Sequence, residues 1–225
     1  MIPRPLIVDE CPPFLIRAFD SEDYARAFLH EGKLRLRNVR HFRDVSDARH
    51  DPNEGIGALQ VPGDVPVIAI DRVTGAARDL GTRPGHISYS QEFINPTYLF
   101  CCSTPDVARS LLRSKFGTTL VCIYAPGAFF KALHRALDTK GYAERALAFI
   151  ECFPVRYDKG EVGQNPADDW RTRLSYGQKP PAFREEHEFR CAVVLGGSQT
   201  GAPECLDLTL EDPLTFCEAI VVDIV

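Results

Sequence analysis

The stretch from Lys179 to Leu195 constrains the fold of this chain more than any other. From Phe189 onward it is a short apolar run that stops at two glycines, which is typical of a buried β-strand. Just before this run lie Glu186 and Glu188, which would point to the same face if the strand extends through them. The chain must therefore hold two carboxylates at the edge of a buried strand, or leave them in a solvated turn paired with neighbouring arginines.

Two carboxylates held this close raise each other's pKa unless a cation or a ligand compensates. The spacing of the two glutamates does not distinguish a ligand-binding site from a solvated charged turn. Features elsewhere in the sequence are needed to choose between these two interpretations.

Composition places the chain among ordinary globular proteins. It has 225 residues, of which 44% are hydrophobic and 25% charged, and these values suit one domain spanning residues 1–225 with a proline-rich, extended arm at 1–13. The net charge of −5 excludes a globally basic nucleic-acid binder but not a local basic face. No apolar run is long enough to cross a bilayer and the first residues lack the apolar core of a signal peptide, so we expect a cytoplasmic protein without a membrane partner.

The eight cysteines show no C-x-x-C pair and no zinc-ligand spacing. Most lie in apolar, strand-like runs, where a free cysteine behaves as a small buried hydrophobe. We therefore expect reduced cysteines, no disulfide and no metal. They are Cys11, Cys101, Cys102, Cys122, Cys152, Cys191, Cys205 and Cys217.

Hydrophobic patterning predicts an α+β fold, a strand-rich domain of mainly antiparallel sheets with three or four helices. Helices are predicted at 22–31, 105–114 and 126–137, and strands at 14–19, 33–38, 56–61, 65–70, 86–91, 97–102, 118–124, 146–157, 189–195, 205–210 and 217–224. The three strands between 56 and 91 would form a meander, with a turn at 62–64. Pro154 predicts an edge strand or a bulge.

Two polar segments are candidates for lining a ligand. The segment 40–55 carries charges of both signs around Asp51-Pro52 and includes Glu54; it is either an exposed loop or part of a polar binding site. The segment 158–180 precedes the acidic stretch and could act as a lid or substrate loop. Ser103 and Thr104 end a buried strand, where either can cap the next helix or contact a ligand.

The order of three residue motifs along the chain resembles a known family signature. Arg17 stands on the first strand, Ser103-Thr104 ends a middle strand and Glu186-x-Glu188 opens a late one. This order resembles the Arg, Ser-Thr-Ser and Glu-x-Glu signature of ADP-ribosyltransferases, although Pro105 replaces the second Ser. The resemblance implies a split, sandwich-like fold that clamps NAD as cofactor.

The resemblance also implies a role for each residue. Arg17 would hold the phosphates or brace the site, and Ser103 would position the catalytic Glu and the nicotinamide ribose. Glu188 would bind the ribose hydroxyl and stabilise the oxocarbenium-like charge that develops as nicotinamide leaves. Glu186 would orient or deprotonate the acceptor.

A second resemblance covers more of the chain. The sequence is similar to a bacterial family of unknown function that shares a late E-x-E-[FY]-R motif, here Glu186 to Arg190, and an Asp-Pro-x-Glu loop, here Asp51 to Glu54. That loop is similar to the cofactor-binding loop of DNA-targeting ADP-ribosyltransferase toxins. Asp51, Glu54 and Thr104 therefore join Arg17 as candidate cofactor-binding residues.

Three hypotheses remain open. The first is an ADP-ribosyltransferase or NAD glycohydrolase that passes ADP-ribose to a protein, a nucleic acid or water, as a toxin, effector or anti-phage defence protein. The second is a metal-dependent nuclease or phosphodiesterase. Its ligands would be Asp44, Asp51, Glu54 and Glu186, with Lys179 as the transition-state cation. The third is a non-catalytic binding or immunity module, in which the charges form surface ion pairs.

Overall fold

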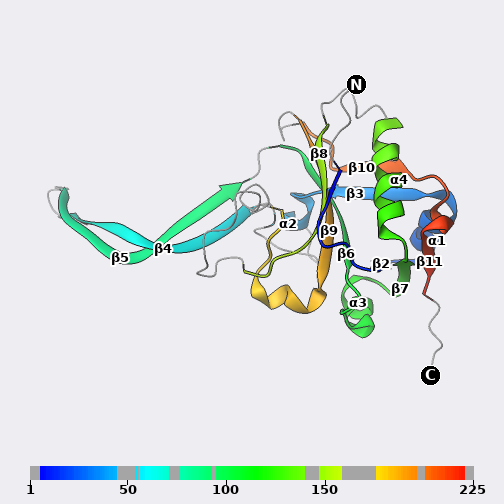
Figure 1. The fold of residues 1–225 in the computed structure, drawn as a ribbon, viewed down its shortest axis with the longest axis horizontal. Helices are drawn as coiled ribbons and strands as arrows, with labels where there is room; N and C mark the ends of the chain where they lie inside the picture. The colour runs from blue at the N-terminus through cyan, green and yellow to red at the C-terminus, as the bar shows by residue number, and fades with distance from the viewer. Residues whose placement is uncertain are drawn as a thin grey trace.

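A computed structural model describes residues 6–44, 54, 56–70, 77–92, 95–139, 147–158, 176–196 and 201–220. Its architecture is a strand-rich α+β fold, in which a curled sheet of nine strands packs against helices and a separate two-stranded ribbon extends away from them (Figure 1). The predicted α+β class is therefore confirmed.

The large sheet has a main path of seven strands in the order β1-β8-β9-β6-β2-β7-β11, with β3 and β10 branching from β6. Only the β1–β8 pair is parallel among the described strands. The strands are β1 (Leu6–Val8), β2 (Leu15–Phe19), β3 (Lys33–Asn38), β6 (Thr97–Ser103), β7 (Thr119–Ile123), β8 (Leu147–Pro154), β9 (Glu188–Leu195), β10 (Cys205–Thr209) and β11 (Cys217–Ala219).

The sheet forks at β6. One edge of β6 pairs along its whole length with β9. Its other edge pairs with β3 at one end, through Leu99 and Tyr98, and with β2 at the opposite end, through Ser103 alone. Because β2 continues with β7 and β3 continues with β10, the two branches diverge and leave the middle of β6 without a strand partner on that side.

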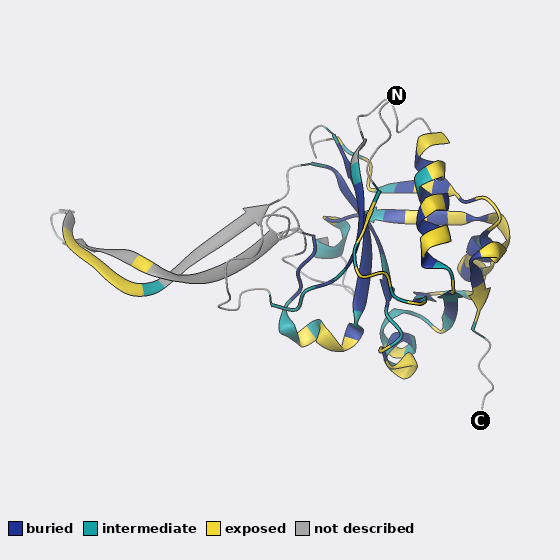
Figure 2. Ribbon diagram, in the orientation of Figure 1, coloured by how far each residue is buried: buried dark blue, intermediate teal, exposed yellow. Residues whose placement is uncertain are grey.

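The helices cover the curled sheet and close the core. They are α1 (Glu22–Glu31), α2 (His41–Asp44), α3 (Arg109–Phe116) and α4 (Pro126–Thr139), with 3₁₀ turns η1 (Pro181–Glu186) and η2 (Pro213–Thr215). Figure 2 shows α4 buried on one side and exposed on the other. Phe129 of α4 packs against Phe28 of α1 and Phe100 of β6, so an aromatic cluster joins both helices to the sheet.

Sequence patterning located most elements of the sheet. Helix α1 is confirmed with both of its predicted ends: Ser21 accepts a hydrogen bond from the Tyr24 amide at 3.3 Å, and Gly32 ends the helix in the left-handed conformation. Strands β3 and β9 lie within one residue of their predicted ranges. Within the predicted N-terminal arm, residues 6–8 form β1, which pairs in parallel with β8.

Two other predictions are wrong in detail. The meander is one long hairpin, β4 (Ile56–Ile70) with β5 (Ala77–Glu92), and the expected turn at 62–64 is paired strand opposite residues 84–86. Neither Ser103 nor Thr104 caps the next helix, because α3 begins at Arg109 after a turn and has no side-chain cap. Pro154 ends β8 and pairs only with Phe189 of β9 among the described residues, since the pairing with β1 stops at Cys152, so the proline lies at a locally unpaired edge as predicted. Most of the proposed lid, residues 159–175, lies outside the described residues.

None of the described helices combines the length and the apolarity needed to cross a membrane.

The end of α1 provides a test of this packing. A Cβ on Gly32, whose φ is +67°, would lie 2.0 Å from the Leu210 carbonyl oxygen. Because both the backbone conformation and the space exclude a side chain, Gly32→Ala should lower the free energy of unfolding by at least about 2 kcal/mol in urea titrations. Gly127→Ala is the control: nothing lies near that position in α4, so this change should be neutral or stabilise by up to about 1 kcal/mol. Equal effects of the two substitutions would contradict the packing described.

Candidate functional site

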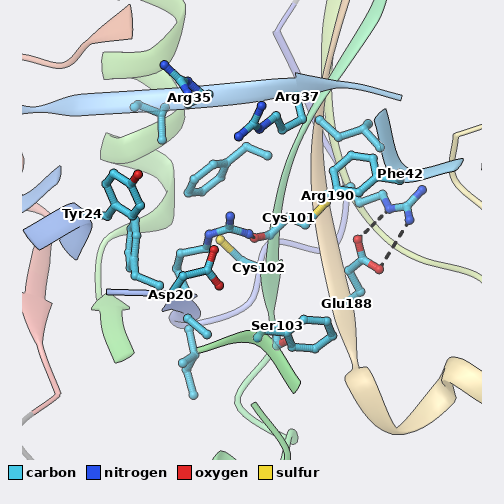
Figure 3. Close-up of a pocket in the computed structure, with 18 of the residues that line it drawn as sticks. Asp20, Tyr24, Arg35, Arg37, Phe42, Cys101, Cys102, Ser103, Glu188 and Arg190 are labelled. Atoms are coloured by element: carbon cyan, nitrogen blue, oxygen red, sulfur yellow. Dashed lines mark hydrogen bonds and ion pairs between the residues drawn. The ribbon is translucent and has the colours of Figure 1, made fainter. Parts of the chain in front are cut away.

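A pocket of about 810 Å³ lies in the fork between β2 and β3. We call it the β6 pocket, since residues Leu99 to Ser103 of β6 line it. Figure 3 shows Cys101, Cys102 and Ser103 in its middle, with Arg37 of β3 on one side and Glu188 and Arg190 of β9 on the other. Its volume is typical of small-molecule sites. The charged residues that line it are Arg17, Asp20, Asp23, Lys33, Arg35, Arg37, Glu54, Lys179, Glu186, Glu188, Arg190 and Asp207.

Arg190 is the centre of a buried ion network beside this pocket. The residue is 1% exposed, and its guanidinium binds both oxygens of Glu54, at 2.7 and 2.9 Å. Its Nε donates to Glu188 at 2.8 Å, and Nη1 also donates to the carbonyl of Tyr176. A buried guanidinium is stable only when its donors are matched in this way, so Arg190 fixes β9 to the segment around Glu54.

Lys179 links the two glutamates of the late acidic stretch. Its Nζ lies 2.8 Å from Glu186 and 2.7 Å from Glu188, and it stacks 5.0 Å from the ring centre of Phe183. Lys115 of α3 approaches the other oxygen of Glu186 at 3.4 Å. The buried part of the network thus holds three carboxylates and two cations, with Lys115 at its half-exposed end.

These contacts decide the charge of the site. Burial would raise the pKa of Glu188, but the charges of Arg190 and Lys179 outweigh burial and hold that pKa well below its ordinary value. Burial would likewise lower the pKa of Lys179, but Glu188 and Glu186 raise it above its ordinary value. Both groups are therefore ionised at neutral pH.

The two glutamates do not lie on one continuous strand. Glu186 ends the 3₁₀ turn η1, His187 adopts a left-handed conformation with φ of 44°, and Glu188 begins β9. The expectation that strand alternation places both on one face is thus wrong, since the tight turn and the shared ammonium of Lys179 bring them together. The Glu188 amide donates to the Tyr157 hydroxyl at 2.6 Å, which holds this turn from the other side.

Arg17 and Ser103 reach the same pocket from neighbouring strands. Ser103 pairs with Glu188 on β9 and with Ile16 on β2, and within the described chain its hydroxyl has no hydrogen-bond partner. The Arg17 Nη1 donates to the carbonyl of Cys101 on the unpaired edge of β6. Its Nε has no acceptor, and Arg17 forms no ion pair with a described residue. Arg17 therefore has unused capacity to bind an anion.

The outcome differs among the other predicted site residues, Glu54, Thr104 and Asp51. Glu54 lines the pocket but is fully engaged with Arg190. Thr104 does not line it; its hydroxyl donates to Asp106 at 3.4 Å and its amide to the His187 carbonyl, so its role is local. Asp51 lies outside the described residues, as does the side chain of Asp44.

Sequence reasoning did not single out the cationic side of the pocket. Lys33, Arg35 and Arg37 all line it from β3. Lys33 pairs with Glu31 and Arg35 with Asp207, whereas Arg37 forms no ion pair with any described residue. The strict alternation of these three cations along one strand is the sequence signal for a cationic side of the pocket, because residues two apart on a strand share a face.

The carboxylates of the buried network, Glu54, Glu186 and Glu188, contact basic side chains. No group of three His, Cys, Asp or Glu side chains in the described part of the chain is arranged to hold a metal ion. Three proposed ligands of the nuclease hypothesis are Glu54, which binds Arg190, Glu186, which binds two lysines, and Asp51, which is not described. These contacts lend that hypothesis no support.

Comparisons of this chain with protein-family models, with curated proteins and with solved structures find no match. The β6 pocket itself is therefore the basis for assigning a function.

The buried network makes a prediction for stability. Arg190→Met would leave Glu54 and Glu188 buried without their main partner, so we expect the free energy of unfolding to fall by about 3–5 kcal/mol. Arg35→Met is the matched control, because the Arg35–Asp207 pair is more than half exposed and should contribute less than about 1 kcal/mol. Urea unfolding followed by circular dichroism measures both. Similar losses in the two variants would show that the buried network is not a major source of stability.

The depressed pKa of Glu188 makes a prediction for pH. A carboxylate whose folded pKa is lowered stabilises the fold above its unfolded pKa, here an ordinary value of 4.5, and loses that contribution as pH falls through the folded pKa. The difference in free energy of unfolding between the wild type and Glu188→Gln should therefore be constant from pH 5 to 8 and shrink below about 4.5. Urea titrations from pH 3 to 8 test this. A difference that is already falling between pH 8 and 6 would contradict the assigned charge state.

Proposed function

We propose that the β6 pocket binds NAD and that the chain cleaves the bond between nicotinamide and ribose, passing ADP-ribose to a nucleophile. The observation that carries this proposal is the meeting of Arg17, Ser103 and Glu188 in one pocket from three neighbouring strands. They are the residues that the resemblance to ADP-ribosyltransferases assigns to catalysis and cofactor binding. The forked sheet is compatible with a split sandwich of that kind.

The distribution of charge supports a dinucleotide. Arg17 and Arg37 line the pocket without a carboxylate partner among the described residues, which suits the two phosphates. Glu188 lines the same pocket and is ionised at neutral pH. A carboxylate there suits the cationic nicotinamide ring and the oxocarbenium-like transition state.

The Ser103 hydroxyl, which has no hydrogen-bond partner among the described residues, completes the proposed arrangement. It lies opposite Glu188 in the β6–β9 register, where side chains are about 5 Å apart. It can therefore hydrogen-bond a ribose hydroxyl while Glu188 faces the anomeric carbon. A chain with this activity would act as a toxin, an effector or a defence component, because it consumes NAD or attaches ADP-ribose to a target.

The catalytic assignment predicts a loss of activity on removing one charge. Glu188→Gln should lower kcat for nicotinamide release from NAD by about 10²–10³-fold, because the developing cation loses its carboxylate, while KM changes little. Nicotinamide release is measured by liquid chromatography. Glu218→Gln, which changes an exposed glutamate on β11, is the matched control and should retain wild-type activity.

Thermal shift with NAD separates failure of folding from failure of chemistry. The Glu188→Gln variant should still melt at a higher temperature with NAD than without it, since Arg17 and Arg37 remain. A folded wild type that neither releases nicotinamide nor shifts with NAD would overturn the proposed function. The buried network would then be structural, as in a binding or immunity module.

A further inference from the structure

The acceptor of ADP-ribose depends on which side chain can receive a proton from it. This inference rests on the proposed function, where Glu186 is the residue that the resemblance assigns to the acceptor. A general base must reach its acceptor at about 2.6–3.2 Å with an available oxygen. Glu186 would need an available carboxylate oxygen to act as this base.

Both oxygens of Glu186 are already engaged. Oε2 lies 2.8 Å from the Lys179 Nζ and Oε1 lies 3.4 Å from the Lys115 Nζ. The residue is 2% exposed. Because both of its oxygens contact ammonium groups and it is withdrawn from solvent, this carboxylate has no oxygen available to an incoming acceptor.

The contacts of Glu186 are not easily given up. Lys179 is buried and holds Glu188 as well as Glu186, so moving Glu186 would leave that ammonium with half of its partners. Glu186 also ends the η1 turn, which is closed by the hydrogen bond from the His187 amide to the Arg184 carbonyl at 3.2 Å. Backbone and side chain together hold the carboxylate in place.

The surroundings also disfavour a cationic acceptor. Lys115 of α3 would repel an arginine side chain brought up to Glu186. Water carries no charge and meets no such repulsion.

We infer that water is the acceptor, so that the chain is an NAD glycohydrolase in which Lys115 and Lys179 keep Glu186 from activating any other nucleophile. The bond between the anomeric carbon and the nicotinamide nitrogen breaks, and its electron pair neutralises the pyridinium ring. A water oxygen bonds to the anomeric carbon and its proton passes to solvent. The products are nicotinamide, ADP-ribose and one proton, with no oxidant or reductant needed.

The test compares two products of the same reaction. The wild type is incubated with NAD alone and with NAD plus agmatine, a soluble histone mixture or a mixed-sequence oligonucleotide. Nicotinamide and free ADP-ribose are quantified by chromatography, and labelled NAD reports any adduct. We expect ADP-ribose and nicotinamide in equal amounts and no labelled acceptor. A labelled acceptor that accounts for most of the released nicotinamide would overturn the inference and leave NAD cleavage standing, whereas no nicotinamide release at all would overturn the proposed function.

A second variant tests the part assigned to Lys115. Lys115→Ala removes the repelling ammonium and releases one oxygen of Glu186, so labelled agmatine should appear beside free ADP-ribose where the wild type forms none. Lys131→Ala, an exposed lysine of α4 outside the pocket, is the matched control and should match the wild type. A folded Lys115→Ala variant that forms no labelled agmatine would overturn the role given to this lysine.

Discussion

The bidentate pair between Arg190 and Glu54 is the contact on which the site depends. Arg190 lies in the middle of a buried strand, where a guanidinium costs several kcal/mol unless every donor is matched. Glu188 supplies part of that match from the same strand, and Glu54 and the Tyr176 carbonyl supply the rest from two other segments of the chain. The cost of burying one cation thus determines where these segments lie, and with them one wall of the pocket.

The fork of the sheet explains why a pocket exists beside this wall. Strand β6 is fully paired with β9 but meets β2 and β3 only at its two ends. Backbone groups left without a strand partner need another one, and the side chain of Arg17 supplies it for the Cys101 carbonyl. The same geometry leaves room in front of β6, and the chain surrounds that room with charges of both signs.

Local sequence signals predicted elements better than they predicted contacts. The capping Ser21, the closing Gly32 and the alternation in β3 are read within a few residues, and the structure confirms those elements. The hairpin β4–β5 was divided at 62–64 because proline and glycine are common in turns, yet cross-strand pairing with 84–86 keeps the backbone extended there. Whether such a segment turns or stays extended depends on pairing partners far away in sequence. Local propensity does not predict those partners.

The candidate site shows the same division. The order of Arg17, Ser103 and Glu188 along the chain predicted a common pocket, and they do line one. The partners of the two glutamates were not predicted, because Lys179, Lys115 and Arg190 reach them through a tight turn, a helix and a strand register. Strand alternation gave the wrong reason for the closeness of Glu186 and Glu188, since a left-handed residue stands between them.

The single residue pair that joins β2 to β6 has a mechanical consequence. Rotation of the β2–β7 wing away from the β3–β10 wing would disturb the strand pairing of Ser103 with Ile16, while the longer ladders within each wing would stay intact. Helix α1 contacts strands of both wings, however, and therefore braces them against such a rotation. The width of the cavity in front of β6 thus depends on the packing of α1 against both wings as well as on this one pair of residues.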